Sequence, residues 1–216
     1  MAITLYEMAV SPPCRAVLMV IRHLGIEVNR KHLNLLAGDH LKPEFVKLNP
    51  LHQVPVLDDN GFVLSESRAI LTYLCNKYAP DSSLYPKDPK VRAIVDRMLY
   101  FDSGTLHMTQ KAVTRPIMLT GKSAGEEQHE AYRNALRFFE EFLSRTPYAA
   151  GNHITLADYS IFATLTMAEA FKIKFDDYPK VSAWMEKLKS EVPSHKELNE
   201  EPLQQLKEYM KSKNFI

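Results

Sequence analysis

Residues 49–70 read NPLHQVPVLDDNGFVLSESRAI, and the rest of the chain is organised around this stretch. It predicts two short apolar strands, one centred on residues 54–57 and one on residues 62–64. The tripeptide DNG at 59–61 separates them and predicts a hairpin, because Asn and Gly tolerate the positive φ angles of such turns. The stretch therefore predicts a β-hairpin that leads directly into a helix.

That helix begins at the junction Ser65-Glu66-Ser67-Arg68. Either serine is a suitable N-cap, because a serine hydroxyl can accept a hydrogen bond from a backbone N–H of the first turn. Glu66 lies near the positive end of the helix dipole. The first-turn N–H groups and the Ser67 hydroxyl form a candidate anion site, and Asp102 is a candidate charge partner for Arg68.

Pro55 is unusual because it lies inside the first predicted strand, between Val54 and Val56. Proline cannot donate a ladder hydrogen bond, so it belongs at a sheet edge or a bulge. A cis Val54–Pro55 bond would turn the backbone and leave the N–H and C=O of Val54 free to bind an extended peptide. The alternative is an edge-strand proline with no function.

The composition is that of a globular protein, with 45% hydrophobic and 25% charged residues in 216. The net charge of +1 provides no basic field for nucleic acid or for an anionic membrane. No apolar run approaches the roughly 20 residues of a membrane span, and no secretory signal pattern is visible. Cys14 and Cys75 are the only cysteines, which suits a reducing compartment. We therefore expect a cytoplasmic protein without nucleic-acid or membrane partners.

The first 80 residues mix strand-like and helix-like patterns. Pro12 or Pro13 begins a helix with an apolar face, and Gly25 ends it. The expected elements, in chain order, are a strand at 3–6, this helix, a strand at 28–33, a short helix at 43–47, the two hairpin strands and a helix at 67–77. The order βαβ-α-ββα fits one small α/β domain.

Strand-like alternation ends before the stretch at 79–87, which is rich in Pro and Ser and which we interpret as a linker. Thr155 and Asp158 resemble a capping box and begin a helix that should be buried. The expected helices span 90–118 with a break near Pro116, 125–143, 155–170, 178–190 and 197–210. We therefore predict an α/β domain over residues 1–80 and an all-helical bundle domain over residues 88–216.

Ser11 takes the first position of a pattern that is spaced like a Cys-x-x-Cys redox motif and opens the first helix. At that position the helix dipole stabilises a thiolate. A serine cannot exchange disulfides, but its hydroxyl can donate a hydrogen bond to the thiolate of a ligand and lower the pKa of that thiol. Local sequence alone favours a simple N-cap for Ser11. Cys14 falls on the apolar face and is expected to be buried.

His40 and His52 lie in loops beside short elements. A loop histidine usually lies at the surface without a specific role. The eight histidines form no pair at ligand spacing with cysteine or carboxylate partners, so we expect no metal site.

Four runs, in order, resemble the cytosolic glutathione S-transferases, and the N-terminal half is similar to the arthropod delta and epsilon classes. The runs are SPPCRAVLM (11–19), NLLAGDHLKPEF (34–45), NPLHQVPVLDDNGFVLSESRAI (49–70) and FDSGTL (101–106), with the capping box of residues 155–158 in the expected place. SPPC resembles the epsilon pattern and ESRA the delta pattern, so the class stays open. The family fold is a thioredoxin-like domain followed by a helical domain, in agreement with the predicted partition.

The resemblance implies a site for glutathione as co-substrate, with no tightly bound cofactor, in a homodimer. Ser11 would be the catalytic hydroxyl that stabilises the glutathione thiolate. The other contacts implied are the Val54 backbone before a cis Pro55 for the cysteinyl unit, Glu66, Ser67 and Arg68 for the γ-glutamyl end, and His40 and His52 for the glycyl end.

The stretch at 107–118, HMTQKAVTRPIM, differs most from the family, which often has aromatic residues there that line the electrophile site. Met108, Lys111, Arg115 and Met118 are the candidate residues for that site in this chain. Fewer rings and two cations predict a pocket that accepts anionic or longer aliphatic electrophiles.

The resemblance predicts an enzyme that conjugates glutathione to hydrophobic electrophiles in detoxification. The same thiolate also suits glutathione-dependent peroxide reduction or double-bond isomerisation, and the sequence does not name the physiological electrophile. One alternative is a non-catalytic glutathione-transferase-like protein that binds ligands or partners. A thiol–disulfide oxidoreductase is a weaker alternative, because position 11 carries no cysteine.

Overall fold

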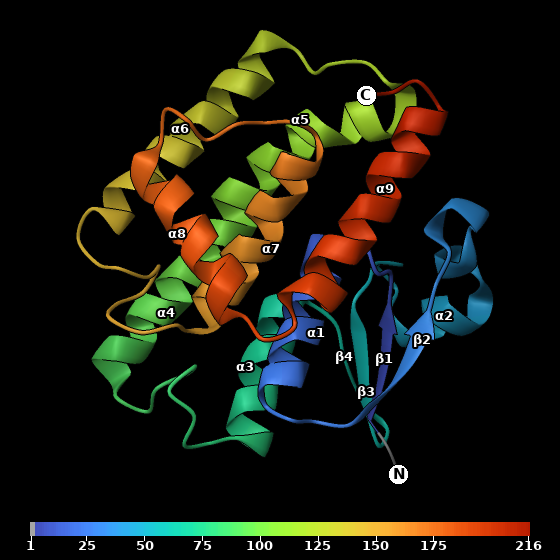
Figure 1. The fold of residues 1–216 in the computed structure, drawn as a ribbon. Coiled ribbons are helices and arrows are strands. Elements are labelled where there is room, and N and C mark those ends of the chain that lie inside the picture. The colour runs from blue at the N-terminus through green and yellow to red at the C-terminus, as the bar shows by residue number, and fades with distance from the viewer. Residues whose placement is uncertain (1–2) are drawn as a thin grey trace.

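A computed structural model describes residues 3–216 as a mixed four-stranded sheet with helices, followed by a helical domain (Figure 1). The strands are β1 (Ile3–Glu7), β2 (Val28–His32), β3 (Val56–Asp59) and β4 (Phe62–Leu64). The helices are α1 (Pro12–His23), α2 (Pro43–Leu48), α3 (Ser67–Tyr78), α4 (Pro89–Phe101), α5 (His107–Thr120), α6 (Glu126–Leu143), α7 (Leu156–Ala170), α8 (Pro179–Glu191) and α9 (Glu201–Ser212). Further segments are the 3₁₀ turns Leu35–Ala37 and Asp39–Leu41 and the π-helical turns Asp102–Leu106 and Lys196–Glu200.

The sheet has the order β2-β1-β3-β4, with β1 parallel to β2 and β3 antiparallel to both β1 and β4. The predicted hairpin is confirmed, since Asn60 and Gly61 have φ angles of 54° and 94°. The first hairpin strand begins later than predicted, at Val56, so that Val54 and Pro55 precede it. The physical reason is that proline has no N–H for the strand ladder.

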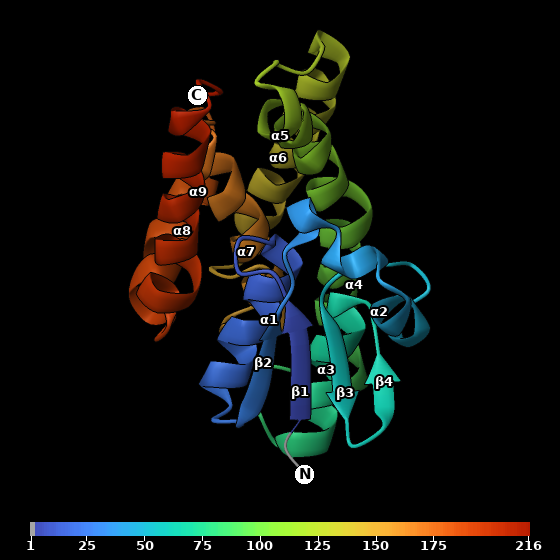
Figure 2. The same cartoon turned by 90° about the vertical axis from the view of Figure 1, so that its right-hand side faces the viewer.

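Helices α1 and α3 lie side by side on the face of the sheet that is turned toward the helical domain (Figure 2). Pro12 and Pro13 occupy the first turn of α1, where their missing N–H groups cost no hydrogen bond. The cap of α1 is Leu24, and Gly25 follows it with a φ of 66°. Gly25 is therefore the residue after the cap and not the cap itself, and its left-handed conformation directs the chain away from the helix axis toward β2.

The long helix predicted at 90–118 is interrupted at a different place. It does not break near Pro116, because α5 continues through this proline to Thr120. The interruption is instead the π-helical turn Asp102–Leu106 between α4 and α5. A proline removes one bond of the helical ladder, and Val113 and Thr114, which are buried, keep this part of α5 packed.

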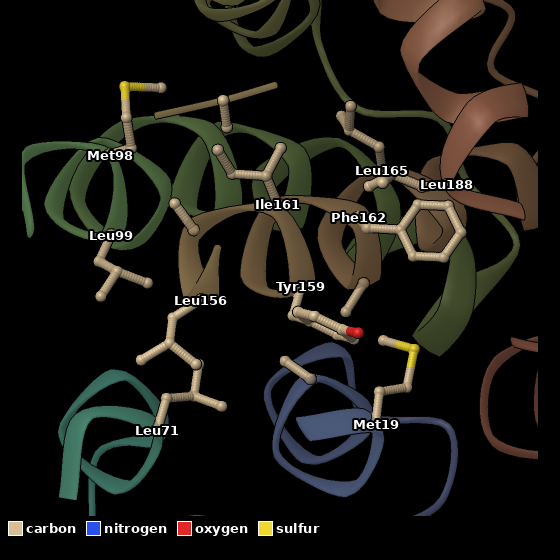
Figure 3. Close-up of a cluster of buried hydrophobic side chains, with 14 of the residues drawn as sticks. Met19, Leu71, Met98, Leu99, Leu156, Tyr159, Ile161, Phe162, Leu165 and Leu188 are labelled. Atoms are coloured by element: carbon tan, nitrogen blue, oxygen red, sulfur yellow. The ribbon is translucent and has the colours of Figure 1, made fainter. Parts of the chain in front are cut away.

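The central element of the helical domain is α7, which is buried along nearly its whole length. Figure 3 shows its side chains Tyr159 and Leu156 near Met19 of α1 and Leu71 of α3, with Leu99 of α4 beside them. Helix α7 is buried on nearly all sides, and it joins the helical domain to α1 and α3.

The capping box predicted at the start of α7 is present. The Asp158 carboxylate accepts the Thr155 backbone N–H at 2.8 Å, and it also accepts the Ala149 N–H at 2.8 Å and the Trp184 indole N–H at 3.0 Å. One buried carboxylate therefore begins α7 and ties it to α8 and to the loop before it.

The predicted fold class, an α/β sheet domain followed by a helical domain, is confirmed. The sheet-bearing part ends with α3 at Tyr78, and α4 begins at Pro89. We propose residues 1–80 and 88–216 as the two domains, with residues 79–87 as the linker. Across residues 3–216 no helix combines the length and the apolar character that crossing a bilayer requires.

Candidate active site

Ser11 lies immediately before α1, in the N-cap position, with φ of −68° and ψ of 123°. Within residues 3–216 its hydroxyl makes no capping hydrogen bond to the first turn. The backbone fixes its position, because its N–H donates to the Met8 carbonyl at 2.9 Å and its carbonyl accepts the Arg15 N–H at 2.9 Å. The simple N-cap interpretation is therefore incomplete, since the hydroxyl is not used to cap the helix.

Cys14 is fully buried, as predicted. Burial raises the pKa of the Cys14 thiol to about 12, and a hydrogen bond with the Ser11 hydroxyl lowers it only in part. Cys14 is therefore a neutral thiol at physiological pH, and the Ser11 hydroxyl has a weakly polar neighbour that a stronger acceptor can replace. This arrangement does not favour disulfide exchange, which requires a thiolate.

Glu66, and not Ser65 or Ser67, occupies the N-cap position of α3. Its φ of 69° turns the chain sharply from β4 into the helix, so that Ser67 is already the first helical residue. The predicted serine cap is therefore wrong, and no side chain of residues 3–216 caps this end of α3. The free N–H groups of the first turn and the buried Ser67 hydroxyl can receive a carboxylate, with exposed Glu66 beside them.

Arg68 pairs with Asp102 at 2.5 Å, which confirms the predicted charge pair. The guanidinium also donates to the Ser67 hydroxyl at 3.0 Å and so orients it. Asp102 is completely buried in the π-helical turn before α5 and accepts the hydroxyls of Ser160 at 2.5 Å and Thr164 at 2.9 Å. The α3 terminus is therefore fixed to α7 of the other domain.

The electrostatics of this cluster keep Asp102 charged. Burial opposes ionisation of Asp102, but the charge of Arg68 and the hydrogen bonds from Ser160 and Arg68 hold its pKa below the usual range. Burial lowers the pKa of His107 to about 4, against the Asp102 charge, so this imidazole is neutral at physiological pH.

His40 and His52 lie close together, with ring centroids 6.1 Å apart. His40 belongs to the 3₁₀ turn Asp39–Leu41 and is partly buried, while His52 is exposed and has a φ of 44°. The Nδ1 atom of His40 is buried and has no hydrogen-bond partner within residues 3–216. The two predicted residues therefore form a pair that can donate to an anion.

The Val54–Pro55 peptide bond is cis. Within residues 3–216 the Val54 N–H and C=O make no hydrogen bond to another backbone group. Val54 is partly buried and Pro55 is buried, and both lie immediately before β3. The free N–H and C=O can therefore pair with an extended peptide.

The four electrophile-site candidates share one face of α5, at intervals of three, four and three residues. Met108 and Arg115 are exposed, and Lys111 and Met118 are partly buried. Met118 packs against an apolar cluster formed by side chains of α7 and α9. The members of this cluster are Met167, Ala170, Phe171, Leu203, Leu206 and Met210.

Val10, the residue before Ser11, packs against the same apolar cluster as Met118. Of the four candidates, Met118 is therefore the one that packs against the same cluster as the residue before Ser11, and sequence analysis did not select Val10. It also did not select Ser160, Thr164 or His107, because serine, threonine and histidine in a helix carry no local signal of a distant partner.

Among residues 3–216, no three His, Cys, Asp or Glu side chains come together in a way that could hold a metal ion. The polar groups instead suit an extended peptide that carries a thiol, an α-carboxylate at one end and an anionic group at the other. A sheet domain followed by helices, with polar groups of these kinds, is the arrangement of a protein that binds a small peptide.

Comparisons with known proteins agree with this class. Residues 5–82 match the family "Glutathione S-transferase, N-terminal domain", and residues 105–191 match "Glutathione S-transferase, C-terminal domain". Glutathione S-transferase D7 of Anopheles gambiae is 42% identical over 211 residues, which cover 97% of each chain. The chain belongs to the glutathione S-transferase family.

Solved structures give the same result. A delta-class glutathione transferase of Nilaparvata lugens is 44% identical, with a TM-score of 0.92, over 97% of this chain and 99% of that chain. An epsilon-class enzyme of Musca domestica is 38% identical, with a TM-score of 0.90, over 98% of both chains. The predicted resemblance to the insect delta and epsilon classes is confirmed.

Proposed function

We propose that this protein is a glutathione transferase that joins the sulfur of reduced glutathione to electrophilic substrates, with Ser11 as the catalytic hydroxyl. The observation that carries the proposal is the position of Ser11: its side chain stands at the N-terminus of α1 without capping the helix. A hydroxyl placed there can donate to a thiolate, and the helix dipole favours the same negative charge.

In this proposal each part of glutathione has its own set of contacts. The Val54 backbone would pair with the cysteinyl unit. The α3 terminus would hold the γ-glutamyl carboxylate through Ser67, whose hydroxyl is oriented by Arg68, and Glu66 would take the γ-glutamyl ammonium. The remaining contacts are those of the His40 and His52 pair with the glycyl carboxylate, and of buried Pro55 with the apolar side of the peptide.

The reaction needs no bound cofactor in this mechanism. The thiol proton goes to solvent, the sulfur lone pair forms a bond to an electrophilic carbon, and a leaving group departs with its bonding electrons. A free thiol of pKa about 8.5 is only a few per cent ionised at neutral pH, and lowering this pKa by about two units raises the thiolate fraction more than tenfold. Binding also converts an encounter of two molecules into one oriented complex.

The electrophile would bind between Ser11 and the apolar cluster that Val10 and Met118 share. Met108, Lys111 and Arg115 continue the same face of α5 and bring two cations to it. We therefore propose apolar or anionic electrophiles in preference to flat aromatic ones.

We further propose a homodimer in the cytoplasm. Helix α4 exposes three apolar side chains, Val91, Ile94 and Tyr100, and Tyr100 is 76% exposed in the single chain. Exposed apolar side chains of this kind suit burial against a second copy. Both cysteines are free thiols, which suits a reducing compartment.

The test is conjugation of glutathione to a chloronitroaromatic and to an anionic electrophile, together with calorimetric titration of glutathione. Saturable turnover with both substrates in the presence of bound glutathione supports the proposal. Glutathione binding without turnover on any electrophile would favour a ligand-binding role, and absence of binding would contradict the proposal.

A further inference from the structure

Arg15 is a buried cation on α1 that the proposed chemistry does not use. Its residue is 0% exposed. The guanidinium donates to the Ala163 carbonyl at 2.8 Å, to the Thr166 hydroxyl at 2.9 Å and to the side-chain oxygen of Asn199. All three acceptors are neutral, and no carboxylate of residues 3–216 forms an ion pair with Arg15.

This arrangement keeps the positive charge uncompensated. Burial lowers the pKa of Arg15 to about 9, so the guanidinium is still charged at neutral pH. Buried charges are normally paired with an opposite charge, because their desolvation is costly. The neutral acceptors satisfy N–H groups of Arg15 without cancelling its charge, and a charge in a medium of low dielectric acts over a longer range than one in water.

Arg68 differs from Arg15 because its partner is a carboxylate. Both arginines meet a π-helical turn of the helical domain: Arg68 meets Asp102 in one turn, and Arg15 meets Asn199 in the other. Asp102 and Asn199 are both 0% exposed. The chain therefore places a carboxylate against the partly buried Arg68 and an amide of nearly the same shape against the fully buried Arg15.

Arg15 lies near the N-terminus of α1, which begins at Pro12. The Arg15 N–H donates to the Ser11 carbonyl at 2.9 Å, so the backbones of the two residues are one helical turn apart, about 6 Å along the axis. Long side chains on a helix point back toward its N-terminus. The charge of Arg15 also reaches His107 on α5 and His195 before the second π-helical turn, where it opposes protonation.

We propose that Arg15 acts as a buried electrostatic support for catalysis, whose uncompensated charge stabilises the glutathione thiolate held at Ser11, and that Asn199 preserves this charge by being an amide. This inference rests on the proposed function. Arg15 does not touch the substrate, so it is a positioning residue that adds to the helix dipole and to the Ser11 hydroxyl.

The titratable and charged groups around Arg15 belong to several elements. Burial keeps Cys14 on α1 a neutral thiol, and it lowers the pKa of His107 and of His195, so that both are neutral at physiological pH. The charged groups that act on the two histidines are Lys111 on α5, Glu169 on α7, Lys189 on α8, Glu200 in the second π-helical turn, and Asp102 with its partner Arg68.

Substitution Asn199→Asp tests the proposal, because it adds a counter-charge to Arg15 with almost no change of shape. The measured quantity is the pKa of enzyme-bound glutathione, from thiolate absorbance and from the pH profile of kcat/KM. We expect this pKa to rise by about half a unit or more, with a corresponding loss of thiolate at pH 6.5. A purely structural role for Arg15 predicts no rise, because the aspartate keeps the hydrogen bond.

The matched control is Asn134→Asp on α6. Asn134 also accepts a hydrogen bond from an arginine, Arg137, but both side chains are exposed. This variant adds the same charge at the protein surface, where solvent screens it, and should leave the thiol pKa unchanged. An equal rise in both variants would overturn the proposal, because the effect would then come from net charge alone.

A second reporter does not depend on glutathione. In a Ser11→Cys, Cys14→Ser chain, the rate of alkylation by iodoacetamide against pH gives the pKa of a thiol at position 11. Adding Asn199→Asp should raise that pKa, and an unchanged value overturns the inference about Arg15. Absence of glutathione binding in the wild type would instead contradict the proposed function, so the two failures are distinguishable.

If Asn199→Asp does not fold, substitution of Arg15 itself tests whether its charge lowers the thiol pKa. Arg15→Lys keeps the charge, whereas Arg15→Gln removes it and keeps a hydrogen-bonding side chain of similar length. We expect the thiol pKa to stay near the wild-type value with lysine and to rise with glutamine. The same pKa in both variants would overturn the proposal.

Discussion

Substitution Asp102→Asn removes the charge that pairs with Arg68 and leaves the shape of the side chain nearly unchanged. Asp102 is fully buried and accepts three side-chain hydrogen bonds, from Arg68 at 2.5 Å, Ser160 at 2.5 Å and Thr164 at 2.9 Å. The amide can replace only part of this acceptor capacity. Arg68, whose side chain is 16% exposed, would keep a partly buried charge without a counter-charge.

Removing one partner of a buried ion pair costs about 3–5 kcal/mol. Arg68 is still partly exposed, and the amide keeps some of the hydrogen bonds. We therefore expect the free energy of unfolding to fall by an amount near the lower end of this range, about 3 kcal/mol. For a chain of this size, that loss corresponds to a decrease in Tm of about 6–12 °C. The KM for glutathione should also rise, because Arg68 orients the Ser67 hydroxyl.

The pH dependence provides a second check. The Asp102 pKa is lowered in the folded protein, so its stabilising effect is complete above the ordinary aspartate pKa of about 3.9 and is lost as the pH falls through the lower folded value. The difference in the free energy of unfolding between wild type and Asp102→Asn should therefore be constant from pH 5 to 8 and become smaller in acid. Urea unfolding at several pH values measures it.

The control for Asp102→Asn is Asp81→Asn, which breaks the exposed Lys87–Asp81 pair. This variant should show no measurable change in stability, because solvent screens the pair. Equal stability of wild type and Asp102→Asn at pH 7, or a difference that persists in acid, would refute the reasoning about a buried charge pair.

Three further predictions concern other parts of the molecule. Asp158→Ala should cost about 3–5 kcal/mol in urea unfolding, because buried donors including the Trp184 indole lose their acceptor; a loss below 1 kcal/mol would contradict this. Ser67→Ala should raise the KM for glutathione several-fold in steady-state kinetics with a smaller effect on kcat, and an unchanged KM would exclude the anion site. Lys111→Ala and Arg115→Ala should lower kcat/KM for an anionic electrophile and not for a neutral one of the same size, whereas equal effects on both would rule out charge recognition.

The parts of the fold that sequence predicted well depend on local chemistry. Asn60 and Gly61 specify the hairpin, and Pro12 and Pro13 specify the start of α1, because each needs only its own backbone conformation. The capping box at Thr155 is equally local. These signals require no knowledge of the partner surface.

The features that sequence analysis missed depend on distant contacts. Glu66 becomes the N-cap of α3 because the hairpin turns the chain at a positive φ, which no residue preference for glutamate indicates. The π-helical turn at Asp102–Leu106 replaces the break expected near Pro116, and it turns Asp102 toward a partner on α3. Helical periodicity alone cannot locate such an insertion.

The position of Arg15 in the sequence indicates that it has polar partners inside the protein. It is an arginine within the apolar run that forms the buried face of α1, next to Cys14. A cation in such a run must find polar partners inside the protein. Its partners, Thr166 and Asn199, lie more than 150 residues away in the chain, so the sequence could indicate that partners exist but not which ones they are.

The proposed mechanism depends on the Ser11 hydroxyl, which stabilises the glutathione thiolate. The most direct measurement is the pKa of bound glutathione in wild type and in Ser11→Ala, with glutathione affinity measured on both. We expect the alanine variant to bind glutathione with similar affinity, the thiol pKa to rise toward its value of about 8.5 in solution, and kcat at neutral pH to fall in proportion. An unchanged pKa and an unchanged kcat in Ser11→Ala would contradict the claim and remove Ser11 from the catalytic role.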